Sequence, residues 1–372
     1  MKILVTGANG FIGKNLICGL KNRGFSDIYE YDVDTDPNNL DIYTENCEFV
    51  FHLAGVNRSE INDDFMDGNF GFTSILLDKL KENGNKSPIL ISSSIQAAFD
   101  NVYGKSKKAG EDYARNYGIE NGVKTYIYRL TNVFGKWCRP NYNSVIATFC
   151  HNIANGLDIA VNDPTVELKL IYIDDVVNEF VALLENSADF MQNNENFYSV
   201  KPVHTVTLGE IAELIYSFKE SRQTLRISDQ SDGFAKKLYA TYLSYLPKNE
   251  FSYPLKMNTD ERGSFTEFIK TPDRGQVSVN VSKPHIVKGN HWHNTKNEKF
   301  LVVSGKGVIR FRKPHDDEII ECFVSAEKLE VVDIPPGYTH NIENLGDTDM
   351  VTIMWANEEF NKANPDTYFL EI

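Results

Sequence analysis

The sequence predicts an α/β domain with a doubly wound parallel sheet, followed by an all-β domain. Three observations support this. The chain has 372 residues, enough for two cores. Its first part reads strand, glycine turn, helix and strand, the order of a parallel βαβ unit. The segment after about residue 249 is instead rich in β-branched residues. We expect the domains to span residues 1–247 and 248–372.

Composition limits the possible function classes. A hydrophobic content of 41 % with 24 % charged residues is ordinary for a globular protein. The formal net charge of -14 opposes binding to a polyanion, so nucleic acid is not an expected partner. Five dispersed cysteines without a C-x-x-C pair suit a reducing compartment, and no apolar run reaches the length of a membrane span. We therefore expect a cytoplasmic protein without a membrane segment.

The N-terminal stretch predicts a dinucleotide site. The strand Lys2–Thr6 runs directly into TGANGFIG, which supplies Gly7, Gly10 and Gly13, and a second strand follows at Ile28–Asp32. Glycines in this position let the backbone turn tightly and approach a pyrophosphate, whose charge then lies at the N-terminus of the next helix. Glycines also make ordinary turns, but the flanking strands favour the cofactor interpretation.

Two further positions belong to the same expected site. Asp32 ends the second strand, where a carboxylate can accept hydrogen bonds from the adenosine ribose, and this favours NAD(H). The alternative is a solvated acidic loop, because Asp34 and Asp36 follow. A third strand, Cys47–Leu53, leads into Ala54 beside the expected phosphate position.

The next candidates are a serine, a tyrosine and a lysine. A fourth strand, Pro88–Ser92, runs into further serines, of which Ser94 is the first choice for binding a carbonyl oxygen and Ser93 the second. Tyr103 and Lys107 are four residues apart and so share a helical face. The lysine can lower the pKa of the tyrosine, which can then exchange a proton with a carbonyl oxygen. A Y-x-x-x-K pair alone is more often an exposed pair on a helix.

Together, the glycine turn, the serines and the Y-x-x-x-K pair resemble the extended short-chain dehydrogenase/reductase family. The resemblance implies a Rossmann domain in which Tyr103 and Lys107 are catalytic and Lys107 also touches the nicotinamide ribose. Only eight residues separate Ser94 from Tyr103, fewer than is usual in the family. Ile95 and Gln96 stand where the family's dehydratases carry an acidic residue. That favours reduction or epimerisation over dehydration.

Segments that follow resemble those of nucleotide-sugar enzymes in the same family. They read RLTNVFG and YIDD, and they contain or precede Asn132, Lys136 and Arg139. These three side chains could bracket a sugar diphosphate through charge-assisted hydrogen bonds. A solvated basic loop is the alternative.

A second constellation lies in the all-β part. His291 and His293 alternate along a strand and therefore face the same way, Glu298 follows, and His340 comes from a later strand. Three imidazoles and a carboxylate can hold a divalent metal, most simply zinc. Scattered surface histidines are the alternative, but five of the eight histidines lie between His285 and His340.

The spacing of these residues resembles the two signature motifs of the cupin family. The first is H-x-H, four residues, Glu, six residues, Gly; the second is P-x-G-x-x-H-x-x-x-N, filled by Pro335, Gly337, His340 and Asn344. The resemblance implies a jelly-roll barrel with metal in its mouth. Because this fold hosts isomerases, oxygenases and simple binders, it does not by itself define a function.

A segment that precedes these two motifs indicates which reaction the all-β domain could catalyse. Asp260–Glu267 resembles the D-x-R-G-x-F-x-E segment of the dTDP-4-keto-6-deoxysugar 3,5-epimerases, which are cupins. In those enzymes a histidine near the position of His291 is a base and the metal ligands are absent. Since this chain has the full ligand set, we expect His291 to bind metal. The residue that acts as the proton-transfer base is not assigned, and Tyr338, Lys296 and His285 are unranked candidates.

The whole chain resembles bifunctional enzymes of capsular and O-antigen polysaccharide synthesis, through its domain order and the segments KWCRPNYNSVIATFC, TYLSYLP and GNHWH. The resemblance implies a homodimer that uses NADPH, in which a zinc-bearing cupin epimerises C3 of a UDP-2-acetamido-2,6-dideoxy-4-hexulose. The Rossmann domain then reduces C4 to UDP-2-acetamido-2,6-dideoxy-L-talose, a precursor of UDP-N-acetyl-L-fucosamine. NADPH conflicts with the interpretation of Asp32, and we follow the family.

Three alternatives remain. The cupin could be only a dimerisation or sensing module beside a single reductase. It could use iron for oxygenation, since three histidines and a glutamate do not select one metal. The Rossmann domain could be a 4-epimerase that retains NAD and shows no net redox.

Overall fold

The computed structural model describes residues 1–372 except 186–196, 272, 315 and 364. The chain divides into two compact units. The first contains Met1–Ile215 and Lys236–Pro247, and the second contains Tyr216–Ala235 and Lys248–Ile372. The domain limits expected from the sequence stay a prediction, and each unit is described here by itself.

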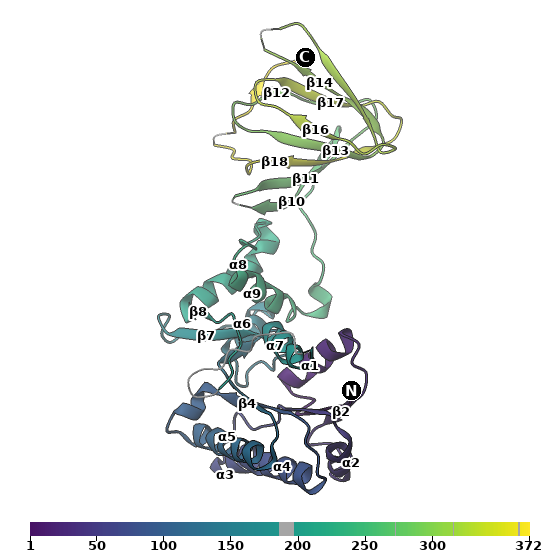
Figure 1. Cartoon of the computed structure of the whole chain (residues 1–372). Helices are drawn as coiled ribbons and strands as arrows, with labels where there is room; N and C mark the ends of the chain where they lie inside the picture. Colours follow the sequence, from purple (N-terminus) through teal and green to yellow (C-terminus); the bar gives the residue numbers. More distant parts are fainter. Residues whose placement is uncertain (186–196, 272, 315, 364) are drawn as a thin grey trace. The chain divides into compact units, whose positions relative to one another are not determined.

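The first unit is built on a parallel sheet of five strands (Figure 1). In chain order these are β1 (Ile3–Thr6), β2 (Ile28–Tyr31), β3 (Phe49–His52), β4 (Ile89–Ser94) and β5 (Thr125–Leu130). Their order in the sheet is β2-β1-β3-β4-β5, so the winding direction reverses between β1 and β3. Ligands of such sheets bind at the carboxyl ends of the strands beside this reversal.

Helices cover both faces of that sheet (Figure 1). Helices α1 (Phe11–Asn22) and α7 (Ile173–Glu185) pack on one face through the core that contains Leu16, Val177 and Phe180. On the other face lie α2 (Asn38–Asn46), α4 (Phe72–Glu82) and α5 (Val102–Asn121), packed around Leu76, Leu77 and Ala114. Apolar strands with few polar interruptions are therefore buried on both sides, as parallel sheets require.

Further helices and a small sheet lie between residues 62 and 243, and the helices at 208–224 and 233–243 are divided between the two units. They are α3 (Asn62–Phe65), a π-helical turn (Met66–Gly71), a 3₁₀ turn (Ile95–Ala98), α6 (Val145–Ala154), α8 (Leu208–Thr224), α9 (Gly233–Leu243), and a small sheet of β6 (Asn132–Phe134), β7 (Glu167–Tyr172) and β8 (His204–Thr207). In the small sheet β6 and β7 run parallel, whereas β8 pairs with β7 antiparallel.

The second unit is a sandwich of two antiparallel sheets. One has the strand order β16-β13-β18-β11-β10-β9 and the other β15-β14-β17-β12-β19. Their bounds are β9 (Asn258–Asp260), β10 (Gly263–Thr271), β11 (Gly275–Ser282), β12 (Val287–Trp292), β13 (Glu298–Ser304), β14 (Lys306–Arg312), β15 (Ile320–Ser325), β16 (Val331–Ile334), β17 (Thr339–Asn344), β18 (Met350–Ala356) and β19 (Tyr368–Phe369). Phe300, Val302, Ile309 and Ile342 form the centre of its apolar core. The fold class predicted from the sequence is confirmed.

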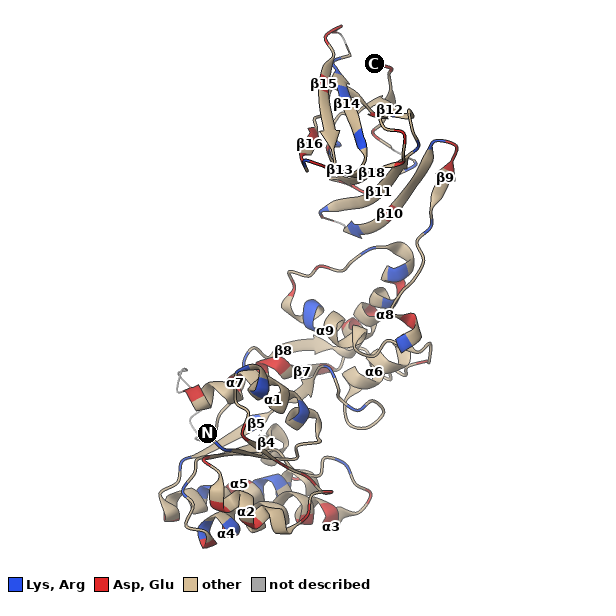
Figure 2. Ribbon diagram, turned by 90° about the vertical axis from the view of Figure 1, so that its right-hand side faces the viewer, with Lys and Arg blue, Asp and Glu red and all other residues tan. Residues whose placement is uncertain are grey.

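Charged residues of both signs are interspersed along both units (Figure 2). Within the described ranges, no helix combines the length and the apolar character that crossing a bilayer requires.

Candidate functional site

The glycine turn after β1 brings two backbone segments together. Gly7 has a φ of +71°, and a Cβ built on it would lie 2.7 Å from the backbone nitrogen of Ala54. A Cβ on Gly13 would lie 2.1 Å from the carbonyl oxygen of Gly7. Helix α1 begins directly after Gly10, with no side-chain cap and no acidic residue in its first turn. Its free N–H groups and the positive end of its dipole can therefore receive an anionic group such as a pyrophosphate.

Asp32 lies just after β2, beside this turn. Its carboxylate accepts hydrogen bonds from the backbone N–H groups of Asn9 (2.7 Å) and Val33 (2.8 Å). The carboxylate is thus fixed next to the glycine turn, where the sequence led us to expect it. Its role in selecting the cofactor stays a prediction.

The predicted serine and tyrosine lie together at the end of the sheet. Ser94 ends β4, and Tyr103 lies in the first turn of α5, which is capped by the Asn101 side chain accepting from Gly104 N (2.7 Å). The Tyr103 hydroxyl donates to Asn57 Oδ1 at 3.1 Å, and the nearby Ser94 side chain lowers the Tyr103 pKa. The short connection between β4 and α5, which contains the 3₁₀ turn, is therefore long enough to bring both hydroxyls together.

Lys107 lies next to Tyr103 on α5 but does not have the expected effect on it. Burial raises the pKa of Tyr103, and only the hydrogen bond with Ser94 opposes that rise. The Lys107 ammonium lies 5.9 Å from the centre of the Tyr103 ring and donates to the carbonyl of Ser92 at 3.3 Å. Burial lowers the pKa of Lys107 itself to about 8, partly opposed by Glu111. The expected lowering of the Tyr103 pKa by Lys107 is therefore wrong for this structure.

The two neighbouring serines have different partners. Ser93 is 5 % exposed and donates to Glu111 Oε1 at 2.5 Å, which links β4 to α5. Glu111 also accepts from Arg129 Nε (2.9 Å) and Nη2 (2.7 Å). Sequence reasoning missed this buried group, although the four-residue spacing from Lys107 to Glu111 placed both on one helical face. Ser94, the first choice, is the serine that contacts Tyr103.

The three side chains expected to bracket a diphosphate each have a protein partner. Lys136 pairs with Asp174 at 2.5 Å, and Asn132 donates to the carbonyl of Lys169 at 3.3 Å. The Arg139 guanidinium stacks 5.2 Å from the centre of the Tyr142 ring. Their role in binding substrate stays a prediction.

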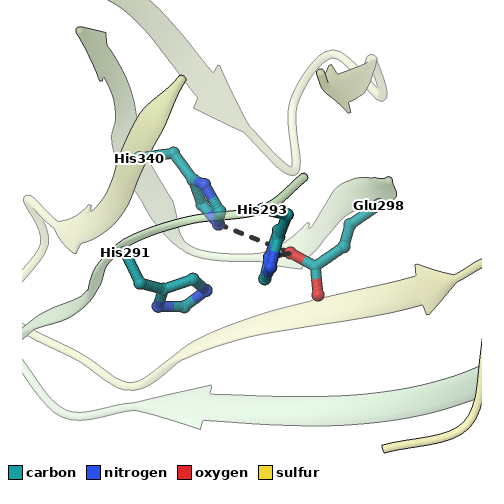
Figure 3. A group of neighbouring side chains, drawn as sticks. All are labelled: His291, His293, Glu298 and His340. Carbon is teal, nitrogen blue, oxygen red and sulfur yellow. Dashed lines mark ion pairs between the residues drawn. The ribbon is translucent and has the colours of Figure 1, made fainter. Parts of the chain in front are cut away.

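In the second unit, the four predicted metal ligands converge (Figure 3). His291 lies near the end of β12, His293 directly after that strand, Glu298 begins β13, and His340 is the second residue of β17. One possible ligand atom from each lies within 4.8 Å of the others. In the pairing of β12 with β17, His291 is opposite His340, so two ligands are brought together by register.

The charges and hydrogen bonds of this group fit a cation. Glu298 Oε2 lies 3.6 Å from His293 Nε2 and 3.4 Å from His340 Nε2. His293 Nε2 and both ring nitrogens of His340 are buried without a hydrogen-bond partner, a costly arrangement unless something binds there. Burial, with the neighbouring histidines, lowers the pKa of His291 to about 4. Burial raises the pKa of Glu298, but the nearby His293 and His340 rings outweigh this and hold that pKa below its usual range.

The ring nitrogens of the three histidines, of which His291 has a lowered pKa, and the Glu298 carboxylate are donor types that a divalent metal binds. One of them is oriented by a group that the sequence did not reveal. The Nδ1 atom of His293 lies 2.6 Å from the backbone carbonyl oxygen of Asp366, 73 residues away.

The metal group lines a cavity of about 920 Å³ inside the sandwich. Of the three candidate bases, Lys296 lines this cavity; it is 6 % exposed and its Nζ lies 5.6 Å from the centre of the Phe360 ring. His285 is exposed and lies 3.5 Å from Asp347, and Tyr338 packs against the apolar core. Neither is among the described residues that line the cavity.

A parallel sheet with a glycine turn and a hydroxyl pair at its carboxyl edge defines an NAD(P)-dependent enzyme of the reductase and epimerase class. The chain belongs to the NAD dependent epimerase/dehydratase family, whose model matches residues 3–197. Residues 258–368 match the polysaccharide biosynthesis C-terminal domain.

Over its full length the chain is CapF-like. It is 58 % identical to the capsular polysaccharide assembling protein CapF of Staphylococcus aureus, with a TM-score of 0.94 and 100 % of both chains covered. A CapF structure with the inhibitor 3-isopropenyl-tropolone is 54 % identical, with a TM-score of 0.90 and the same coverage. The UDP-2-acetamido-2,6-beta-L-arabino-hexul-4-ose reductase of Pseudomonas aeruginosa is 44 % identical over 99 % of this chain and 98 % of that protein.

Proposed function

We propose that this protein catalyses two consecutive steps on one UDP-linked 4-keto sugar of capsular polysaccharide synthesis. The second unit epimerises C3 of a UDP-2-acetamido-2,6-dideoxy-4-hexulose. The first unit then reduces the C4 ketone to UDP-2-acetamido-2,6-dideoxy-L-talose, a precursor of UDP-N-acetyl-L-fucosamine. The name of the Pseudomonas relative supports the 4-keto substrate and the reduction.

The observation that carries the two-step proposal is the group of buried, unpartnered histidine nitrogens in the wall of the second unit's cavity. A domain that only dimerises or senses a ligand has no need to bury such nitrogens around a carboxylate, because each one costs stability. A cavity of about 920 Å³ is large enough for a sugar nucleotide.

For the reduction, the residues of the first unit hold the ketone and supply a proton. The glycine turn of Gly7, Gly10 and Gly13 would hold NADPH, with NADH possible because of Asp32, and the cofactor would supply a hydride for C4. The ketone oxygen is held by the hydroxyls of Ser94 and Tyr103, whose side chains interact in the structure. Tyr103 gives its proton to that oxygen, and its raised pKa keeps the proton in place until then.

For the epimerisation, the second unit holds the ketone while its neighbouring carbon exchanges a proton. His291, His293, Glu298 and His340 would hold one divalent metal, most simply zinc, which supplies a positive charge that polarises a carbonyl oxygen when bound. A C–H next to such a carbonyl is weakly acidic, and return of the proton to the opposite face inverts C3. Lys296, buried in the cavity wall, is the first candidate for moving that proton.

The related CapF has been crystallised with an inhibitor, 3-isopropenyl-tropolone. Tropolones bind divalent metals through two adjacent oxygen atoms, so a compound of this type is suited to a site built on three imidazoles and a carboxylate.

The two activities are tested by deuterium exchange and by cofactor consumption. The metal-loaded protein is incubated with the 4-keto substrate in D₂O without nicotinamide, and deuterium at C3 is measured. We expect incorporation that stops when a chelator removes the metal. NADPH is then added, and its oxidation should match the product formed mole for mole.

Absence of exchange would leave the second unit as a dimerisation or sensing module. Turnover without stoichiometric loss of reduced cofactor would indicate a 4-epimerase that retains NAD. Oxygen consumption together with bound iron would indicate an oxygenase.

We also propose that the protein is a cytoplasmic homodimer. All five cysteines are free, which fits a reducing compartment. On the second unit, Phe323 of β15 (68 %), Leu329 between the strands (63 %) and Val331 of β16 (58 %) are exposed, and large apolar side chains that stay exposed can mark an interface. Sedimentation at several concentrations would test the dimer.

A further inference from the structure

The short segment between two of the metal ligands has no regular structure of its own. His293 and Glu298 are separated by Asn294, Thr295, Lys296 and Asn297, which belong neither to β12 nor to β13. Backbone groups outside strands must find other partners, or the segment is free to adopt several conformations. The position of both ligands therefore depends on what this segment binds.

A single carboxylate binds most of it. Asp366 Oδ1 accepts from the backbone N–H of Asn294 at 3.0 Å. Its Oδ2 accepts from the backbone N–H groups of Thr295 (2.9 Å) and Lys296 (3.0 Å) and from the Thr295 hydroxyl (3.1 Å). Three successive N–H groups and a hydroxyl on one carboxylate make charge-assisted hydrogen bonds that fix the path of the segment.

The same residue also orients a ligand directly. The backbone carbonyl oxygen of Asp366 lies 2.6 Å from His293 Nδ1. Because a carbonyl oxygen can only accept a hydrogen bond, Nδ1 must be the donor. The proton of the neutral ring is then on Nδ1, and the lone pair on Nε2 faces the other ligands. Asp366 thus sets both the tautomer of His293 and the rotation of its ring.

Neighbouring contacts hold Asp366 in place. The strand that follows it, β19, pairs with the end of β12, where His291 lies opposite Phe369. The Thr339 hydroxyl donates to the carbonyl of Leu370 at 2.5 Å, which ties the same segment to β17, the strand that carries His340. The segment around Asp366 therefore contacts β12, β17 and the stretch that joins His293 to Glu298.

We propose that Asp366 is the positioning residue of the metal site: through its carboxylate and its carbonyl it holds His293 and the segment leading to Glu298 in the geometry that binds a divalent metal. This inference rests on the proposed metal-dependent function of the second unit. It adds a residue that is not one of the four candidate ligands.

The test is Asp366→Asn in the full-length protein. Asp366 has a φ of +37°, a conformation that asparagine tolerates and alanine does not, so asparagine separates loss of the carboxylate from backbone strain. The amide of asparagine has one oxygen that can accept a hydrogen bond, in place of two in the carboxylate. Its NH₂ group would face an N–H donor of the segment and could not accept that hydrogen bond. The matched control is Asp349→Asn, because Asp349 binds Lys283 at 2.8 Å and is not among the described residues lining the cavity.

Zinc affinity is measured by competition with a chromophoric chelator, and the visible spectrum of the cobalt-loaded protein is recorded. We expect Asp366→Asn to bind zinc roughly 10- to 100-fold more weakly and to change the cobalt spectrum, as is usual when a residue that orients a metal ligand is lost. Asp349→Asn should match the unmodified protein. The thermal midpoint of both metal-free variants, measured in parallel, shows that each is folded at the temperature of the titration.

Equal zinc affinity and equal cobalt spectra in Asp366→Asn and the unmodified protein would overturn this inference alone. An equal loss in both variants would overturn it as well, because the effect would not be specific to Asp366. If the unmodified protein itself bound no divalent metal, the proposed metal site would fail, and this inference with it.

Discussion

Replacing Tyr103 with phenylalanine tests whether the two sites act independently. The change removes one hydroxyl, whose hydrogen bond to Asn57 is exposed, and leaves the ring against Phe65 at 5.9 Å between ring centres. Stability should therefore change by less than about 1 kcal/mol. Loss of a positioned proton donor typically costs about 10²- to 10⁴-fold in rate, so the barrier to reduction should rise by roughly 2.7 to 5.5 kcal/mol.

The assay measures two rates on the same protein: NADPH oxidation with the 4-keto substrate, and deuterium incorporation at C3 without cofactor. Tyr103→Phe should lose the first and keep the second. Tyr113→Phe is the matched control, because Tyr113 lies on the same helix and its hydroxyl donates to Asp78 at 2.6 Å, at the surface. Loss of C3 exchange in Tyr103→Phe would refute the independence of the sites, and reduction at the control's rate would refute the role of the hydroxyl.

Three further predictions concern the metal, the pH dependence and the cofactor. His293→Ala should release the metal and abolish C3 exchange while NADPH binding persists, and His285→Ala should change neither; metal content and cofactor titration would show this. Because burial lowers the pKa of Lys107 to about 8, its charge is lost as the pH rises through that value, so kcat/KM for reduction should fall above about pH 8. Glu111→Gln should move this fall to lower pH, because the Glu111 charge raises the Lys107 pKa. An unchanged pH profile in this variant would contradict the assignment of the fall to Lys107. Asp32→Ala should raise the NADPH-to-NADH preference about tenfold by removing a charge that repels the 2′-phosphate. A clear NADH preference in the unmodified protein would contradict the cofactor expected from the family.

The order of the main strands and helices could be predicted because apolar residues recur with a different period in strands and in helices. The predicted strands at Lys2–Thr6 and Ile28–Asp32 agree with β1 and β2 within a residue or two at each end. The small sheet of β6, β7 and β8 could not be assembled in advance. Its strands are short and far apart in the sequence, and only tertiary contacts determine that β7 pairs with both others.

The first site was predictable where covalent spacing determines geometry. Tyr103 and Lys107 share a helical face because they are four residues apart. The choice between Ser93 and Ser94 was harder, since adjacent strand residues point to opposite faces and the sequence does not say which face meets α5. In the structure Ser93 faces α5 through Glu111, yet Ser94, the last residue of β4, is the serine that interacts with Tyr103, so strand alternation alone would have chosen the other serine.

The second site shows a similar division between side chains that bind and groups that orient. Only a few residue types bind metals well, so His291, His293, Glu298 and His340 leave a signature in the sequence.

The register of strand pairing, in contrast, leaves no signature in the sequence. Lys288 is opposite Ile342 and His291 is opposite His340, with a bulge between Gly289 and His291. Because of this bulge, Lys288 and His291 both line the cavity, although strict alternation would place residues three apart on opposite faces. Asp366 acts on backbone N–H groups, which every residue but proline carries, so its partners cannot be recognised from residue type. The ligands of such a site can therefore be predicted from one sequence, whereas the residues that orient them require coordinates.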